Sequence, residues 1–328
     1  RMLAARPEVL VERAFYPGIP EEGRPHDGTL RSLEHDTALG AFDVIAITSS
    51  FELDWLNIPS ALREGGVEPL ADERGLDEPL VIIGGPAVTA NPQPLAPLAD
   101  ALFVGEVEPV FDAMVEALLD PEDAPGRLAE VPGFLVPTVE QAGIERVALE
   151  HLDAVPTTSA ILTPRSEFPD TFLIETGRGC PRGCRFCLAR RIYHPVRSRS
   201  AESILASARV GLQFTDRVGL VGAGVADHPR IEQIATGIVA LGGQVSTSSL
   251  RAEGVTPELM AALAGSGRRT ITLAPETADE ELAATLGKRV SFEAVRDAIG
   301  LADDAGVTEV KLYFMVGLAG DPDHEVQL

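Results

Sequence analysis

The 328-residue sequence predicts an α/β protein in which a doubly wound parallel sheet is followed by a curved, partly closed parallel barrel. Short apolar runs alternate with amphipathic stretches along the first 120 residues, which is typical of a parallel sheet covered by helices. The alternation restarts at Thr171 with a longer period, and right-handed crossovers would curve those strands into a barrel. We therefore expect a first domain at residues 1–120, a connector at 121–170 and a barrel at 171–328.

The first domain is expected to contain four strands and two helices. The apolar runs that predict strands are residues 11–16, 42–48, 79–83 and 101–104. Helices are predicted at residues 53–63 and 109–119, and the second ends at the proline-rich stretch 120–125. The connector is rich in proline and carries one alternating run, residues 144–149, which indicates a hairpin or an edge strand.

The barrel region repeats a β-then-α unit five times. Strands are predicted at residues 172–176, 218–221, 244–248, 270–274 and 307–316. Helices are predicted at residues 201–212, 229–241, 257–264, 279–286 and 292–305. Active sites of such barrels assemble at the carboxyl ends of the strands.

Composition restricts the classes of partner. The net charge is −23, and lysine occurs only at Lys288 and Lys311, so the chain should repel nucleic-acid backbones. The longest apolar runs are too short to cross a bilayer. Three closely spaced cysteines and no hydrophobic leader indicate a reducing cytoplasm without disulfides. We expect a cytoplasmic protein with no membrane partner, and the net charge disfavours a nucleic-acid partner unless a local basic patch overrides the field.

The three cysteines are the most specific chemical signal. Cys180, Cys184 and Cys187 form Cys-x3-Cys-x2-Cys on one short glycine-rich loop. Three thiolates can hold three irons of a 4Fe-4S cluster, which leaves one iron open for a substrate or cosubstrate. The alternatives are a zinc site completed by His194 and a set of buried structural thiols.

Arginines cluster around this loop. They either bind a phosphate, a carboxylate or the cofactor, or pair with the surplus of acidic residues. The members are Arg178, Arg182, Arg185, Arg190, Arg191, Arg197 and Arg199.

The cysteine motif, with Phe186 just before its last cysteine, resembles the signature of the radical S-adenosylmethionine (SAM) superfamily. The resemblance implies that the open iron chelates the amino and carboxylate groups of SAM. It implies that the reduced cluster cleaves SAM to a 5'-deoxyadenosyl radical, with the electron from an external donor such as a flavodoxin or ferredoxin. It also implies a (β/α)6 partial barrel. Because five strands are present and the chain opens on Arg1, we interpret the chain as truncated at both ends.

Glycines and polar residues follow the second and third barrel strands. Gly222 and Gly224 admit a close backbone approach, which the resemblance assigns to the SAM amino group, or they form a tight turn. Ser248, Ser249 and Arg251 suit the carboxylate and ribose of SAM. The alternative for this run is the chemistry of a helix start, since residues 256–257 read as an N-cap followed by proline.

The fourth and fifth predicted strands each carry one further candidate site residue. Glu276 can accept hydrogen bonds from ribose hydroxyls, or it belongs to the first turn of the next helix. Lys311 shares one strand face with Tyr313 and Met315. If that face is the barrel interior, Lys311 needs a carboxylate or substrate partner, and otherwise it is solvated.

Several stretches are similar to one branch of the superfamily. This branch consists of uncharacterised proteins with an N-terminal cobalamin-binding-type, Rossmann-like domain, distantly similar to the methylthiotransferases and to cobalamin-dependent radical SAM methyltransferases. The similar stretches are residues 177–180, 195–199, 248–251, 272–276 and 311–318.

Small residues close two strands of the first domain, and the resemblance implies that they contact the nucleotide tail and corrin edge of a cobalamin. These residues are Thr48, Ser49, Ser50, Gly84, Gly85 and Pro86. The usual Asp-x-His-x-x-Gly lower-ligand motif is missing, so a bound cobalamin would lack a histidine lower ligand. The alternative is a Rossmann-like domain that binds no cofactor.

The sequence thus predicts a radical SAM enzyme with a 4Fe-4S cluster, SAM and cobalamin, which performs methyl transfer or rearrangement at an unactivated carbon of an unidentified substrate. One alternative is a cobalamin-free enzyme resembling the methylthiotransferases, although no cysteines remain for a second cluster. The other is a binding module whose cluster senses iron or oxygen.

Overall fold

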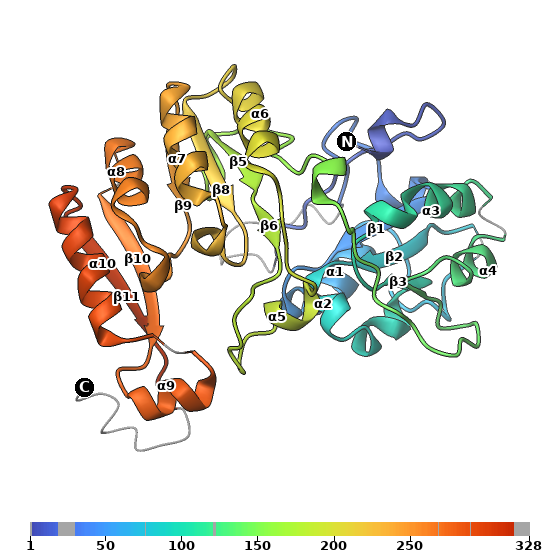
Figure 1. The fold of residues 1–328 in the computed structure, drawn as a ribbon. Helices are drawn as coiled ribbons and strands as arrows, with labels where there is room; N and C mark the ends of the chain where they lie inside the picture. The colour runs from blue at the N-terminus through green and yellow to red at the C-terminus, as the bar shows by residue number, and fades with distance from the viewer. Residues whose placement is uncertain are drawn as a thin grey trace, which may run out of the picture. The chain divides into compact units, whose positions relative to one another are not determined.

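The computed structural model describes residues 2–18, 30–75, 77–120, 123–267, 269–288 and 290–317. Its internal contacts divide the chain into two units, Arg1–Leu149 and Glu150–Leu328, each with its own parallel strands and covering helices (Figure 1). The boundaries drawn from the sequence, at residues 120 and 170, differ from this division. Residues 121–122 of the predicted helix stop and residue 318 of the stretch 311–318 lie outside the described ranges.

The first unit is built on a sheet in the order β1-β2-β3-β4. The strands are β1 Val44–Thr48, β2 Leu80–Gly84, β3 Ala101–Phe103 and β4 Phe134–Leu135. The first three are parallel and coincide with three predicted strands, whereas β4 pairs antiparallel with β3. The core on one side of this sheet joins Val81 and Ile83 to Leu62 of the covering helix.

Two strand predictions for this unit are wrong. Residues 11–16 form no strand, because Arg13 is tied to a loop instead of a ladder: its amide donates to Glu34 and its carbonyl accepts from Leu33. Residues 144–149 form no strand either and contribute only the bridge between Val147 and Gly105. The edge strand of the predicted connector is β4 instead.

Proline interrupts the helices of the first unit. Residues 53–63 were expected to form one helix but divide into a 3-10 turn, Glu52–Leu56, and α1, Ile58–Glu64, because Pro59 lacks a backbone donor and is tolerated only in the first turn. The remaining helical segments are α2 Pro86–Ala90, α3 Phe111–Leu118, α4 Ala124–Ala129 and the 3-10 turns Leu3–Ala5, Leu39–Ala41, Gln93–Leu98 and Glu108–Val110.

The second unit carries the five predicted parallel strands in chain order. They are β5 Thr171–Glu175, β8 Arg217–Val221, β9 Gln244–Thr247, β10 Thr270–Glu276 and β11 Glu309–Phe314. Strands β5-β8-β9 form one sheet and β10-β11 a second, and a parallel bridge from Leu250 to Leu273 connects the two. This is the partial barrel that the sequence predicts.

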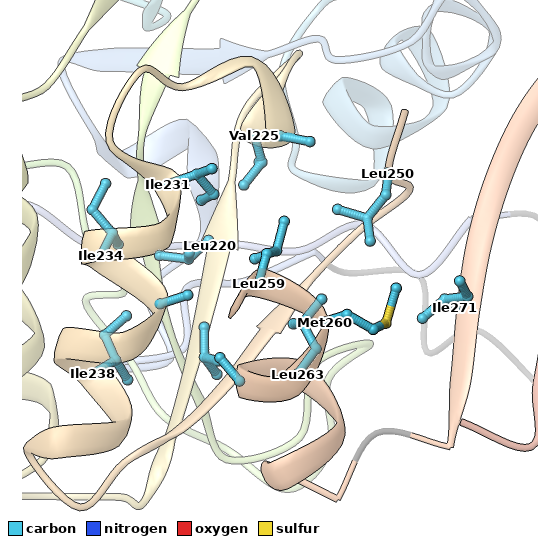
Figure 2. Close-up of a cluster of buried hydrophobic side chains, with 14 of the residues drawn as sticks. Leu220, Val225, Ile231, Ile234, Ile238, Leu250, Leu259, Met260, Leu263 and Ile271 are labelled. Carbon is cyan, nitrogen blue, oxygen red and sulfur yellow. The ribbon is translucent and has the colours of Figure 1, made fainter. Parts of the chain in front are cut away.

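Helices cover one face of these strands. They are α6 Ala201–Gly211, α7 Ile231–Ala240, α8 Pro257–Gly265 and α10 Phe292–Asp304, whereas α9, Glu280–Leu286, lies beyond the ends of β10 and β11 (Figure 1). Residues four apart, Ile234 and Ile238 on α7 and Leu259 and Leu263 on α8, point into one buried cluster with Leu220 of β8 (Figure 2). Because this face is filled by the core, the opposite face and the strand ends remain for a site. Within the described ranges, no helix is long and apolar enough to cross a membrane.

Candidate active site

The cysteine loop is an excursion between β5 and α6 that is closed at its base. There β6, Gly177–Arg178, pairs antiparallel with β7, Arg197–Ser198, and the short helix α5, Ala189–Ile192, lies between them in sequence. Two glycines allow this closure. A Cβ on Gly177 would lie 2.6 Å from the Arg197 carbonyl oxygen, and Gly179 has φ +85° with its Cβ position 2.7 Å from the Tyr193 carbonyl oxygen.

The three cysteines are free thiols on this loop. Cys184 is buried, and Cys180 and Cys187 are half-buried. Burial raises the pKa of the Cys180 thiol above its ordinary value, and the Asp227 carboxylate raises it further, while the Arg182 backbone amide and the Arg251 guanidinium lower it.

Three free thiols within eight positions suit three irons of a 4Fe-4S cluster. Within the part of the chain that the structure describes, no three His, Cys, Asp or Glu side chains are arranged to hold one metal ion. The thiolates of a cluster bind different irons and need not converge on one point.

The arginines near the cysteines fall into two sets. Arg178 and Arg199 both donate to Glu175, at 2.9 and 2.7 Å, and Arg182 pairs with Asp227. Arg197 donates to backbone carbonyls. The second set is exposed and, among the described residues, makes no ion pair: Arg185, Arg190 and Arg191. The sequence left open whether this cluster pairs with acids or binds a ligand; Arg178, Arg182 and Arg199 pair with acids.

Glu175 is the centre of a network that the sequence analysis missed. The Arg199 side chain is almost fully buried, and it also donates to Thr157 Oγ1 at 2.8 Å and to the Leu152 carbonyl. The Arg199 carbonyl accepts from His228 Nε2 at 2.8 Å; His228 Nδ1 accepts a backbone amide, so Nε2 carries the proton of the neutral ring. This network fixes the base of the cysteine loop.

Asp227, in the loop after β8, is a second residue that the sequence analysis missed. Its Oδ1 pairs with Arg182, and its Oδ2 is buried without a hydrogen-bond partner among the described residues. Gly224 lies beside it, because an added Cβ would be 3.1 Å from Asp227 Oδ2, and a Cβ on Gly222 would be 2.8 Å from Thr176 Oγ1. Neither glycine has positive φ, and the backbone turns at residues 223–224, so the structure shows both a turn and a close approach at Gly222.

The end of β9 presents the predicted polar run. Ser248 and Ser249 are exposed and line a cavity of about 360 Å³. Arg251 is half-buried: Nη2 lies 3.4 Å from Glu253, and Nε is buried without a hydrogen-bond partner in the described chain. Thr256 does cap α8, so the helix start accounts for Thr256 but not for Arg251.

Glu276 ends β10 in a strained conformation, with φ +71°. Its Oε1 accepts from the buried Lys288 at 2.5 Å, a partner that the sequence analysis missed. The helix-start interpretation of Glu276 is wrong, because Asp279 caps α9. The end of α9 supports the cysteine loop, since the Leu286 carbonyl accepts from the Arg185 amide at 2.8 Å.

Lys311 lies on the face opposite the helices. It pairs in register with Thr272, whose neighbours Ile271 and Leu273 are buried in the helix-covered core. Tyr313 shares this face and lines the same cavity as Ser248. The interior orientation that the sequence left open is therefore the observed one, although Lys311 itself is exposed.

The strand ends of the first unit are used partly by the fold itself. Ser49 is fully buried, and its hydroxyl accepts from Trp55 Nε1 at 2.9 Å. Gly85 has φ +111°, and a Cβ there would overlap the Ser49 carbonyl. Packing thus accounts for Gly85, whereas Thr48 and Ser50 are exposed and Gly84 and Pro86 are half-buried, so these four are available to a ligand.

Two family models match the chain. "Radical SAM proteins, N-terminal" matches residues 1–137, and "Radical SAM superfamily" matches residues 174–328. The chain belongs to the radical SAM superfamily. Membership implies a 4Fe-4S cluster and SAM as cofactors, which agrees with the three free thiols on the loop after β5.

One relative and two solved structures are similar to the chain. The chain is 32% identical over 302 residues to an uncharacterised protein of Methanocaldococcus jannaschii, covering 90% of this chain and 63% of the relative, so it spans less than two thirds of that protein. The structure of the radical SAM methyltransferase TsrM from Kitasatospora setae, with tryptophan and a SAM analogue bound, superposes with a TM-score of 0.62 at 15% identity, over 87% of this chain and 59% of TsrM. The cobalamin-dependent SAM radical enzyme OxsB, with aqua-cobalamin and SAM bound, gives 0.59 at 16% identity, over 87% of this chain and 42% of OxsB. These similarities show a shared fold.

Proposed function

We propose that the chain is the core of a cobalamin-dependent radical SAM enzyme that performs methyl transfer or rearrangement at an unactivated carbon. The observation that carries the proposal is the set of three free thiols on the loop after β5, beside the unsatisfied polar atoms of Arg251 and Asp227. Cys180, Cys184 and Cys187 would hold the cluster, which would pass an electron from an external donor to SAM for its reductive cleavage.

The residues around the thiols suit the charged groups of SAM. Arg251 Nε is a buried donor without a partner among the described residues, and a carboxylate would satisfy it. Asp227 Oδ2 is a buried acceptor in the same situation, and an ammonium group would satisfy it. Ser248 and Ser249 offer exposed hydroxyls to the ribose, and Glu276 keeps one carboxylate oxygen beyond the one that Lys288 occupies.

The cobalamin part of the proposal rests on the first unit. Its parallel strands place Thr48 of β1 next to Gly84 of β2, and ligands of such sheets bind beyond these strand ends. Thr48 and Ser50 are exposed there and suit the polar edge of a corrin. TsrM has been solved with cobalamin and a 4Fe-4S cluster bound, and OxsB with aqua-cobalamin and SAM bound.

The electron for SAM cleavage must come from an external donor such as a flavodoxin or ferredoxin. The exposed Arg185, Arg190 and Arg191 form a basic patch around the cysteine loop in a protein of net charge −23. Such a patch would attract an acidic electron donor, although the net charge of the whole protein is also negative. The attraction prevails at short range because salt screens the more distant charges beyond about 8 Å.

The test is purification without oxygen from cells supplied with cobalamin. We expect the protein to retain a corrin absorption spectrum on gel filtration, together with about four irons per chain. Replacing the exposed hydroxyls, T48V and S50A, should reduce the retained corrin without changing the iron content. If the unmodified protein retains iron but no corrin, the cobalamin part is wrong and a cobalamin-free radical SAM enzyme remains.

A further inference from the structure

The cavity of about 360 Å³ in the second unit is large enough for a small molecule, since ligand pockets span about 300–1,000 Å³. It lies where the two sheets of this unit meet. The end of β9 forms one wall, the start of β10 a second and Tyr313 of β11 a third, while Phe168 precedes β5. Ser248 and Ser249 place the cavity next to the proposed SAM site.

The walls of this cavity are neutral and rich in hydroxyl groups. Ser248, Ser249, Thr272 and Tyr313 contribute hydroxyls that make none of the hydrogen bonds found among the described residues. Phe168 and Tyr313 present rings that are 46% and 58% exposed. A ligand here would meet flat apolar surfaces and neutral hydrogen-bonding groups.

One cation flanks these neutral walls. Lys311 pairs in register with Thr272 and precedes Tyr313 by two residues, so its side chain emerges on the cavity side of β11. The chain's other lysine, Lys288, is paired with Glu276, whereas no described carboxylate lies within ion-pair distance of Lys311. An unpaired ammonium at the rim of a neutral cavity favours a ligand with one anionic group.

We propose that this cavity binds the second substrate and that this substrate is a small aromatic carboxylate. Its ring lies against Phe168 and Tyr313, its carboxylate pairs with Lys311, and a polar ring substituent bonds to the Thr272 hydroxyl. The word substrate rests on the proposed radical SAM function. Binding itself does not need SAM cleavage, so the two can fail separately.

The test is a ligand-observed NMR titration with two probes of nearly equal shape, 4-hydroxybenzoate and the uncharged 4-hydroxybenzamide. A hydrogen bond to a charged group corresponds to about a tenfold gain in affinity. The unmodified protein should therefore bind the acid about tenfold more tightly than the amide. K311M should abolish this preference, and K311R should keep it. R209M, which removes one positive charge from an exposed site on α6, should leave the preference intact.

Other outcomes separate the alternatives. Equal affinity of the acid and the amide in the unmodified protein would overturn the proposal, as would an acid preference that survives K311M. Displacement of the acid by SAM would overturn it too, because the cavity would then belong to SAM. If the acid binds through Lys311 but the reconstituted protein does not cleave SAM, the site stands and the proposed function fails.

Discussion

The substitution E175Q tests the network that closes the cysteine loop. Glu175 accepts from Arg178 Nε at 2.9 Å and from Arg199 Nη2 at 2.7 Å, and the side chains of the two arginines are only 10% and 2% exposed. Glutamine preserves the shape and one acceptor oxygen but removes the charge and turns an amide NH2 toward a guanidinium. At least one charge-assisted hydrogen bond is therefore lost, and one buried cation loses its counter-charge.

We expect E175Q to cost about 2 to 3 kcal/mol, less than the full loss of a buried ion pair because one acceptor remains. For a unit of this size, that corresponds to a fall in melting temperature of roughly 4 to 12 °C. The matched control is E202Q on α6, whose partner Arg230 is also an arginine but whose ion pair is largely exposed. The control should cost about 0.5 kcal/mol, or roughly 1 to 2 °C.

The assay is thermal unfolding of both variants, followed by circular dichroism and accompanied by iron analysis after anaerobic reconstitution. E175Q should also retain less iron than E202Q, because the β6–β7 base that brings the cysteines together depends on Arg178 and Arg199. Equal melting temperatures and equal iron contents for the two variants would refute the reasoning.

Three further predictions use other parts of the chain. G85A should destabilise the protein by at least about 2 kcal/mol, because Gly85 has φ +111° and the new Cβ would overlap the Ser49 carbonyl. The control G300A lies in open space on α10 and should stabilise the protein by about 0.5 to 1 kcal/mol. Thermal unfolding of both variants measures the difference. R251A should weaken SAM binding by about 1.5 to 3 kcal/mol in calorimetry without loss of iron. The control R217A lies at the opposite end of β8 and should leave SAM binding unchanged. Equal SAM affinities of the two variants would show that Arg251 is not part of the site. The backbone amides of Glu68 and Gly75 lower the pKa of Glu78 below its ordinary 4.5, so its stabilising effect exists above that pH and disappears as the pH falls through the lowered value. The difference in unfolding midpoint between the unmodified protein and E78Q should shrink on acidification, and a constant difference would contradict this.

The apolar runs correctly predicted strands in both units wherever the run has a hydrogen-bonded partner strand in a sheet. The five strands of the second unit and β1 to β3 of the first are such runs. Residues 11–16 have the same apolar content but no ladder partner, and pairing is a property of the fold that local pattern does not contain. The break at Pro59, in contrast, was visible in the local sequence. Proline lacks a backbone donor, and this lack divides the predicted helix into two segments.

Site residues could be predicted from the sequence where they lie close together with a characteristic spacing. The cysteine motif and the glycines after β8 are such cases. Glu175, Asp227 and Lys288 do not, because each acts through a partner that is distant in sequence or in the following loop: Arg199, Arg182 and Glu276. A lone acid beside a strand end has no spacing that distinguishes it from a solvated one. The rarity of lysine was the one available hint to Lys288.

Reductive cleavage of SAM is the most direct measurement of the central claim. The anaerobically reconstituted protein, given SAM and a strong reductant, should release 5'-deoxyadenosine and contain about four irons per chain. C184A, which removes the buried thiol of the loop, should lose both the iron and the product. Stoichiometric zinc in anaerobic protein, with no 5'-deoxyadenosine above the level of C184A, would contradict the account.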